Sequence, residues 1–225
     1  MNRMTDTTVT RRQPSVLSTN KVLRNTYMLL SMTLLFSAAM AGLAMMFHVP
    51  RGTAMIASFA AIGLVWFALP RTANSSAGIL VVFGIAGLLG FSIGPMVGSY
   101  LSFPDGPRVV GTALGGTGLI FLGMSGYALT SKRDFSFMGG MLFTGLIIAL
   151  IGSIASIFFH IPAFSLAISG MIALVMSGMI LFDTSRIING GETNYIHATV
   201  SLYLNIYNLF SALMHILMSF AGGDD

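Results

Sequence analysis

The segment LFDTSRIINGGETNYIHATVSLYLNIYNLF, residues 181–210, decides the fold of the last part of the chain, because it sets charged groups between two apolar runs. Asp183, Arg186 and Glu192 lie in it, together with asparagines and a series of hydroxyl side chains. A charge at the middle of a lipid bilayer costs on the order of 2.5–3.5 kcal/mol. Polar groups kept at that depth should face the protein interior, and we expect the functional residues in this segment.

The composition predicts a protein that is integral to a membrane. Of the 225 residues, 55% are hydrophobic and only 8% are charged, and the mean hydropathy is +0.84, whereas a soluble domain has roughly 25% charged residues. The apolar runs are continuous, which favours helices over the alternating strands of a membrane barrel. The 26 glycines and 17 methionines suit close helix packing. The chain has no cysteine, which excludes disulfides and thiolate metal sites.

Seven apolar runs are long enough to cross a bilayer as helices, and the first would span about 32 Å. Proline and glycine separate the runs, as is typical of helix ends and turns. The predicted fold class is therefore an all-α membrane protein with seven transmembrane helices: residues 27–47, 53–69, 77–101, 109–130, 138–159, 163–182 and 197–221. We expect residues 1–26 to form a flexible basic tail, residues 27–221 the bundle, and residues 222–225 a short tail at the other face.

The positions of lysine and arginine predict the orientation of this bundle. With the N-terminus in the cytoplasm, only Arg51 and Arg108 lie in outer loops. The inner segments then hold nine basic residues: Arg3, Arg11, Arg12, Lys21, Arg24, Arg71, Lys132, Arg133 and Arg186. This asymmetry predicts a cytoplasmic N-terminus and an outer C-terminus. It also explains the net charge of +4 without nucleic acid as a partner.

Glycines at a spacing of four mark the third predicted span. Gly90, Gly94 and Gly98 would form a groove for a neighbouring helix. Pro95 removes one backbone hydrogen bond and should kink the same helix. The pattern indicates helix packing, and the functional alternative is a hinge that lets this helix swing.

The seventh span has a polar stripe. At about 100° per residue, its members fall within an arc of about 80°: His197, Ser201, Asn205, Asn208, Ala212 and His215. Such a stripe should face other helices or water and not lipid. It would either hold the bundle together by interhelical hydrogen bonds or line a translocation path.

Asp183 and Arg186 are three residues apart at the end of the sixth span and so share a helix face. Two interpretations are open. The residues form a charge pair that closes the helix end, or Asp183 is part of a latch that responds to protons or cations.

One motif resembles that of a serine nucleophile. Gly123-Met124-Ser125-Gly126 matches the GxSG pattern of intramembrane serine proteases, which need a histidine within reach of the serine. Only His197 is predicted at a compatible depth, and no residue is in place to orient it. There is no HExxH motif, phosphate loop or Rossmann glycine motif. We therefore expect no enzyme activity and no cofactor.

Several motifs in register resemble the Bax inhibitor family of seven-span membrane proteins. They are GFSIGP (90–95), TALGGT (112–117), KRDFSFMGGM (132–141), GGETNYI (190–196) with SLY (201–203), and STNKVLRNTY (18–27). The resemblance covers nearly the whole chain after the first dozen residues. It implies a bundle in which six helices surround a central seventh.

The resemblance also implies two functions. Bacterial members that this chain resembles bind and modulate the membrane-anchored ATP-dependent protease FtsH, as poor or slow substrates, in the inner membrane. Other bacterial members are pH-sensitive calcium leaks gated by two aspartates, of which Asp183 matches one and Asn205 stands at the position of the other. The polar tail with Arg3, Arg11 and Arg12 would give the protease a flexible segment to grip.

Overall fold

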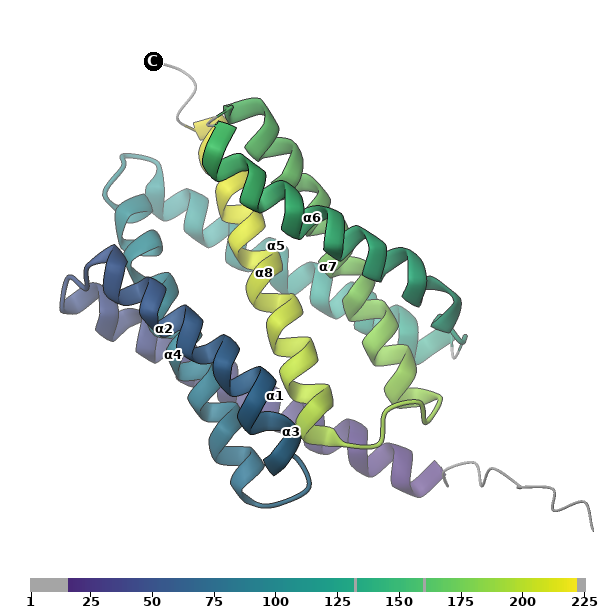
Figure 1. Ribbon diagram of the computed structural model, residues 1–225. Coiled ribbons are helices and arrows are strands. Elements are labelled where there is room, and N and C mark those ends of the chain that lie inside the picture. Colours follow the sequence, from purple (N-terminus) through teal and green to yellow (C-terminus); the bar gives the residue numbers. More distant parts are fainter. Residues whose placement is uncertain (1–15, 132, 160, 222–225) are drawn as a thin grey trace, which may run out of the picture.

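The computed structural model describes residues 16–131, 133–159 and 161–221, and these residues form helices and connections without a strand (Figure 1). Seven helical segments are long and apolar enough to cross a membrane. The elements are α1 (Val16–Met46), α2 (Arg51–Gly63), the π-helical turn η1 (Leu64–Ala68), α3 (Leu69–Thr72), α4 (Ala77–Leu101), α5 (Gly106–Ser131), the 3₁₀ turn η2 (Ser136–Met138), α6 (Gly139–Phe159), α7 (Pro162–Ile188) and α8 (Tyr195–Ala221). The predicted fold class and the number of spans are confirmed.

Helix α1 begins well before the predicted start of the first span. It starts at Val16, so the expectation of a flexible tail up to residue 26 is wrong for residues 16–26. The reason lies in their packing, because Thr26 is fully buried and Val22 and Leu23 pack against the core. Residues 1–15 of the expected tail, with Arg3, Arg11 and Arg12, and the expected outer tail 222–225 lie outside the described residues.

The second span is one continuous helical segment with a π turn before its proline. The sequence predicted an end near Pro70, but the helix runs on to Thr72. A proline ring collides with the carbonyl four residues earlier in a regular α-helix. Here the N–H of Leu69 bonds to the Leu64 carbonyl, five residues back, and the widened turn makes room for the ring. Arg71 donates to the Phe67 carbonyl across 2.6 Å, which satisfies one carbonyl of that turn.

Helix α8 is the centre of the bundle. It packs against α1, α4, α5 and α7, while α2 packs against α4 and α6 against α7. Figure 1 shows α8 in yellow, crossing between the pair of α2 and α4 and the pair of α6 and α7. Leu202, Leu209 and Met214 of α8 are fully buried. A helix surrounded in this way can keep polar groups away from lipid on more than one face.

Helices α1 and α4 approach each other closely at the predicted glycine groove. A Cβ on Gly90 would meet the backbone of Ser37, and a Cβ on Gly94 would meet Ala44. At Gly98 an added Cβ would only touch the Met45 side chain, at an ordinary contact distance of 3.4 Å. These contacts therefore support a role of the glycines in helix packing. The hinge at Pro95, which lies inside α4, stays a prediction.

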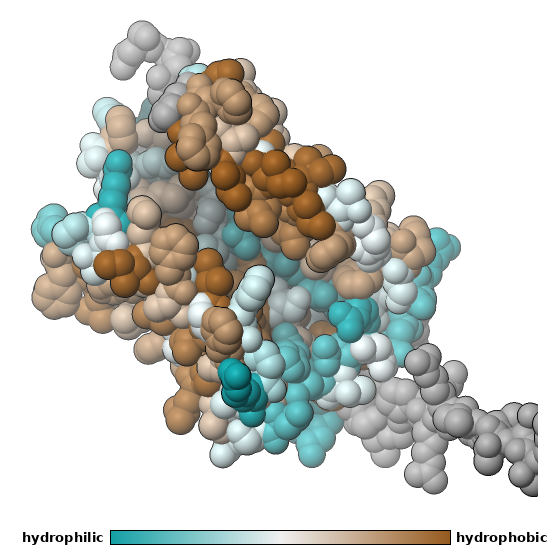
Figure 2. All heavy atoms as spheres, viewed as in Figure 1, coloured by the Kyte–Doolittle hydropathy of each residue, from teal (hydrophilic) through white to brown (hydrophobic). Residues whose placement is uncertain are grey.

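Three connections meet at one end of the bundle. Asn194, just before α8, donates to the Ala73 carbonyl at 3.0 Å, between α3 and α4. Asn189, after α7, donates to the Arg133 carbonyl at 3.3 Å, between α5 and α6. In that same connection, hydrogen bonds from Ser136 lower the pKa of the exposed Asp134 carboxyl. Figure 2 shows hydrophilic residues gathered at this end, whereas the flank over α6 is hydrophobic.

Candidate functional site: a buried aspartate between α7 and α8

The connection between α7 and α8 fixes which residues of the two helices face each other. Gly190 has a positive φ of 74° directly after α7. Gly191 then donates its N–H to the Arg186 carbonyl at 2.7 Å, the pattern of a Schellman helix end. Asn194 accepts a hydrogen bond of 2.9 Å from the N–H of Ile196 and caps α8. The chain thus reverses over a few residues, and α8 returns along α7.

Asp183 lies inside α7, more than one turn before the helix ends, and only 6% of its surface is exposed. One of its carboxylate oxygens, Oδ2, accepts two hydrogen bonds from α8. Ser201 donates its hydroxyl at 2.5 Å, and Asn205 donates its amide at 2.8 Å. The two donors are four residues apart and therefore share a helix face. The structure thus joins Asp183 and Asn205, the two positions that the family resemblance had grouped.

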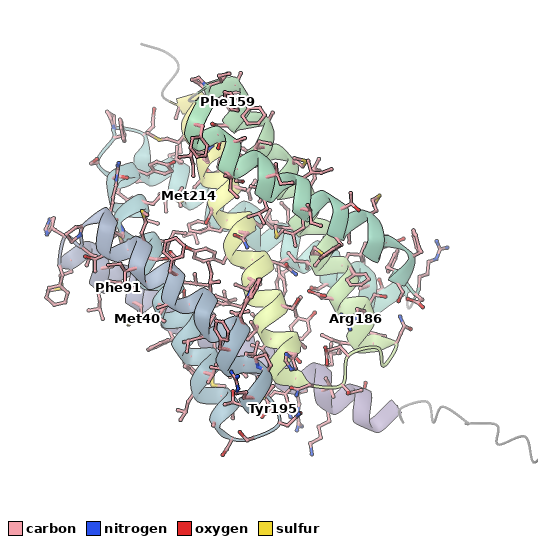
Figure 3. All side chains as sticks on the ribbon, viewed as in Figure 1. Met40, Phe91, Phe159, Arg186, Tyr195 and Met214 are labelled. Carbon is pink, nitrogen blue, oxygen red and sulfur yellow. The ribbon has the colours of Figure 1, made fainter. Side chains whose placement is uncertain are left out.

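The contacts of Arg186 lie at the end of α7. Within the described ranges its guanidinium donates to the Gly191 carbonyl at 3.2 Å and lies 5.6 Å from the centre of the Phe182 ring. Figure 3 shows Arg186 near the end of α7, at the same end of the molecule as Tyr195 of α8. The hydrogen bonds of Asp183 come from the donors on α8, and its charge pair with Arg186 stays a prediction. The latch remains a proposal.

A cavity of ≈ 280 Å³ lies beside the Asp183 carboxylate, where α7 and α8 meet the end of the second span. We call it the Asp183 pocket. Val65 and Leu69 form its apolar side. The polar side carries Asp183, Arg186, Glu192, His197 and Ser201. Among the described residues no group of three His, Asp or Glu side chains could hold a metal ion. The pocket can therefore present one buried carboxylate, with the charged side chains of Arg186 and Glu192 beside it, to a cation or to water.

The predicted polar stripe of α8 does not face the interior along its whole length. Asn205 is buried, and His197, Ser201 and His215 are half-buried, but Asn208 is exposed. The Asn208 amide donates to the Leu204 carbonyl of its own helix at 2.9 Å, so the amide needs no partner on another helix. Asn208 thus bonds within α8 and not to another helix, and the expectation that the stripe faces other helices or water and not lipid stays a prediction here.

The two ends of the stripe contact α7 through different groups. Ser201 and Asn205 bind Asp183 near one end, and His215 Nδ1 lies 3.0 Å from the Ser169 hydroxyl near the other. Such interhelical hydrogen bonds are worth about 0.6 kcal/mol each on average. The contacts support a stripe that holds α7 and α8 together.

Ser125, from the GxSG motif, is buried and its hydroxyl lies 3.3 Å from the Thr184 hydroxyl of α7. Thr184 is also within 3.5 Å of the Tyr27 hydroxyl. A serine nucleophile needs a base that can accept its proton, and a threonine hydroxyl cannot act as one. In the described part of the chain, Ser125 thus joins α5 to α7.

The comparisons with known proteins agree with this architecture. The family described as "Inhibitor of apoptosis-promoting Bax1" matches residues 19–222. This protein belongs to the Bax inhibitor family. It is 52% identical over 201 residues to an uncharacterised membrane protein of Vibrio cholerae, covering 89% of this chain and 90% of the relative. It is 49% identical over 210 residues to the protein named "Modulator of FtsH protease YccA" of Escherichia coli K12, covering 93% and 94% of the two chains.

A relative with lower sequence identity aligns with this chain over nearly the same length. An uncharacterised protein of Pseudomonas aeruginosa is 42% identical over 204 residues, which cover 91% of each chain. The likeness therefore includes the whole bundle and not a single motif. The family assignment expected from the sequence motifs is confirmed.

Four hydroxyl residues of this Bax inhibitor family member, two tyrosines and two serines, were given no role in the sequence analysis. Tyr203 of α8 lies 2.7 Å from the Ser37 hydroxyl of α1 and donates to the Ala86 carbonyl of α4 at 3.2 Å. Tyr207, one turn further along α8, lies 3.2 Å from the Ser92 hydroxyl of α4. The spacing of four between the tyrosines was the available signal.

Proposed function

We propose that this protein binds and modulates the membrane-anchored ATP-dependent protease FtsH in a bacterial inner membrane, as a regulatory partner and not as an enzyme. The observation that carries the proposal is the 49% identity, over 93% of the chain, to a protein named as a modulator of that protease. A second relative, which aligns with this chain over the same length, is named "Inner membrane protein YccA". Because the likeness covers all seven spans, the whole surface of the bundle is available for the same interaction.

The orientation belongs to this proposal. We place the N-terminus and the connections that meet beside α3 in the cytoplasm, because the inner segments carry nine of the eleven basic residues. The ATPase part of such a protease would then meet the tail before α1. Residues 1–15 contain polar side chains and Pro14, a composition typical of a segment without a packed core.

The experiment is co-purification from solubilised membranes. A tagged form of this protein should retain FtsH after detergent extraction, and a tagged seven-span protein of another family is the control. In parallel, the half-life of a membrane substrate of FtsH should lengthen when this protein is overproduced. Absence of both effects would refute the proposal.

The second candidate function is a calcium or cation leak, and the Asp183 pocket is the observation that favours it. A buried carboxylate beside a cavity of ≈ 280 Å³ is the kind of group that marks an ion path. The described pocket offers only one in-span carboxylate, since Asn205 stands where a second would be expected. We therefore rank the leak below modulation of the protease, and calcium flux in liposomes tests it.

A further inference from the structure

The bundle contains a second cavity that is larger than the Asp183 pocket. A cleft of ≈ 490 Å³ lies on a different face of α8 and is walled by α1, α4, α5 and α8. We call it the α1–α5 cleft. Its wall contains aliphatic and aromatic side chains, such as Leu34, Val97, Leu114 and Phe210, and no charged residue. At about 30 Å³ for each molecule in the liquid, a cleft of this size would hold roughly sixteen waters.

The polar groups of the wall are already satisfied. An ordered water in a cavity needs two to four polar partners, and a polar ligand would need free donors or acceptors. The hydroxyls that reach the cleft each have a partner in the protein: Tyr203 with Ser37 and the Ala86 carbonyl, Tyr207 with Ser92, and Thr117 with the Ala113 carbonyl. The wall therefore favours an apolar occupant over water or a polar ligand.

The cleft opens toward the surface that faces lipid. On its rim, Ala38 of α1 is exposed and Leu114 of α5 is 57% exposed. The outer face of α5 continues the apolar surface with Leu119 and Leu122, which are 74% and 66% exposed. Helices α4 and α8 each pack against both α1 and α5 and so form the floor between these two walls. The cleft is thus continuous with the hydrocarbon region around a membrane-spanning bundle.

We propose that the α1–α5 cleft binds one acyl chain of a membrane phospholipid, which enters between α1 and α5 while the headgroup stays at the membrane surface. An unfilled space of this size leaves the atoms of its wall without dispersion contacts on one side. A flexible hydrocarbon chain restores these dispersion contacts and has no polar group that needs a hydrogen bond. This site is separate from the Asp183 pocket and does not depend on the proposed interaction with a protease.

The single tryptophan of the chain makes the proposal measurable. Trp66 is 73% exposed on the second span, so Trp66→Phe gives a background without tryptophan. In this background, Phe121→Trp or Phe210→Trp places a reporter on the cleft wall. The protein is reconstituted in phosphatidylcholine that contains a fraction of lipid with bromine atoms on the acyl chains. Bromine quenches a tryptophan in contact with it, and we expect strong quenching of both cleft reporters.

Neighbouring alanines of α1 supply the matched control. Ala38 lines the cleft and Ala39 does not, and both are exposed. Ala38→Phe should fill the entrance and reduce quenching of the cleft reporter at least two-fold, whereas Ala39→Phe should leave it unchanged. Equal quenching in the two variants would overturn the proposal. Quenching of the reporter by aqueous acrylamide in place of brominated lipid would overturn it too, because the cleft would then hold water.

Discussion

The side-chain amide of Asn205 donates a hydrogen bond of 2.8 Å to the carboxylate oxygen of Asp183 that also accepts from Ser201. The bond joins the sixth and seventh spans inside the bundle. A neutral amide brings no second charge to this contact. The pair therefore differs from two carboxylates in contact, which cannot both be ionised in a medium of low dielectric and must share a proton.

The first prediction concerns pH. We expect the unmodified protein to show no steep pH-dependent calcium flux near neutrality, because Asp183 and Asn205 do not form a pair of carboxylates. Asn205→Asp should create such a pair at hydrogen-bond distance and make the flux depend on pH. Calcium uptake into liposomes, measured across pH for both forms, is the test.

Asp183→Asn is the control for this experiment and should abolish any flux gained by Asn205→Asp. A steep pH response of the unmodified protein that disappears in Asp183→Asn would contradict the argument. The leak would then become the primary function.

The second prediction concerns the contact between α1 and α4. Gly90→Ala adds a Cβ that would collide with the Ser37 carbonyl oxygen. Because that atom is backbone, the helices must move apart, and we expect the free energy of unfolding to fall by about 1–3 kcal/mol. Unfolding in mixed detergent micelles measures the change.

Gly42→Ala in α1 is the matched control for Gly90→Ala. Nothing lies within 4 Å of the Cβ added at Gly42, and replacing a helical glycine with alanine gains roughly 0.5–1 kcal/mol. Similar effects of the two substitutions would show that helix propensity, and not the close approach, controls stability here.

The third prediction concerns the N-terminal residues. Deletion of residues 2–15 should leave the bundle inserted, because Arg71, Arg133 and Arg186 still favour the same orientation. We expect slower degradation by FtsH, since the ATPase needs a segment without stable structure to grip. Pulse-chase labelling gives the half-life, with a deletion of residues 222–225 for comparison. An unchanged half-life of the N-terminal deletion would rule out this tail as the grip.

The fourth prediction concerns orientation. A reporter that fluoresces only in the cytoplasm should be bright when it is fused after Arg133 and dark when it is fused after Asp225, as the distribution of basic residues requires. Equal brightness of both fusions would mean that α8 does not cross the membrane.

The helices could be predicted because apolar runs and their proline and glycine boundaries are local features of the sequence. The bounds of α4 agree with the predicted span at both ends. The end of α7 was predicted less accurately, because hydropathy falls at Asp183 although the helix continues to Ile188. Hydropathy reflects the free-energy cost of placing a side chain in lipid. A carboxylate that accepts hydrogen bonds from a neighbouring helix is shielded from lipid, so this cost does not end the helix at Asp183.

The partners of the site residues could not be predicted, because they depend on how helices rotate against each other. Periodicity placed Ser201 and Asn205 on one face of α8 but could not say that Asp183 faces them. It also grouped Asn208 with them, although Asn208 is exposed and bonded within its own helix. The contact of Ser125 with Thr184 could not be predicted either, because it joins residues far apart in the chain.

The close contact at Gly90 has a mechanical consequence. Helix α1 is held to α4 by backbone surfaces that interlock, and the same turn of α1 carries Ser37, whose hydroxyl lies 2.7 Å from that of Tyr203 on α8. A force that pulls on the N-terminal end of α1 acts along the helix and loads these contacts in shear, so they must break together and not one after another. The first helix therefore resists extraction most where it touches both α4 and α8.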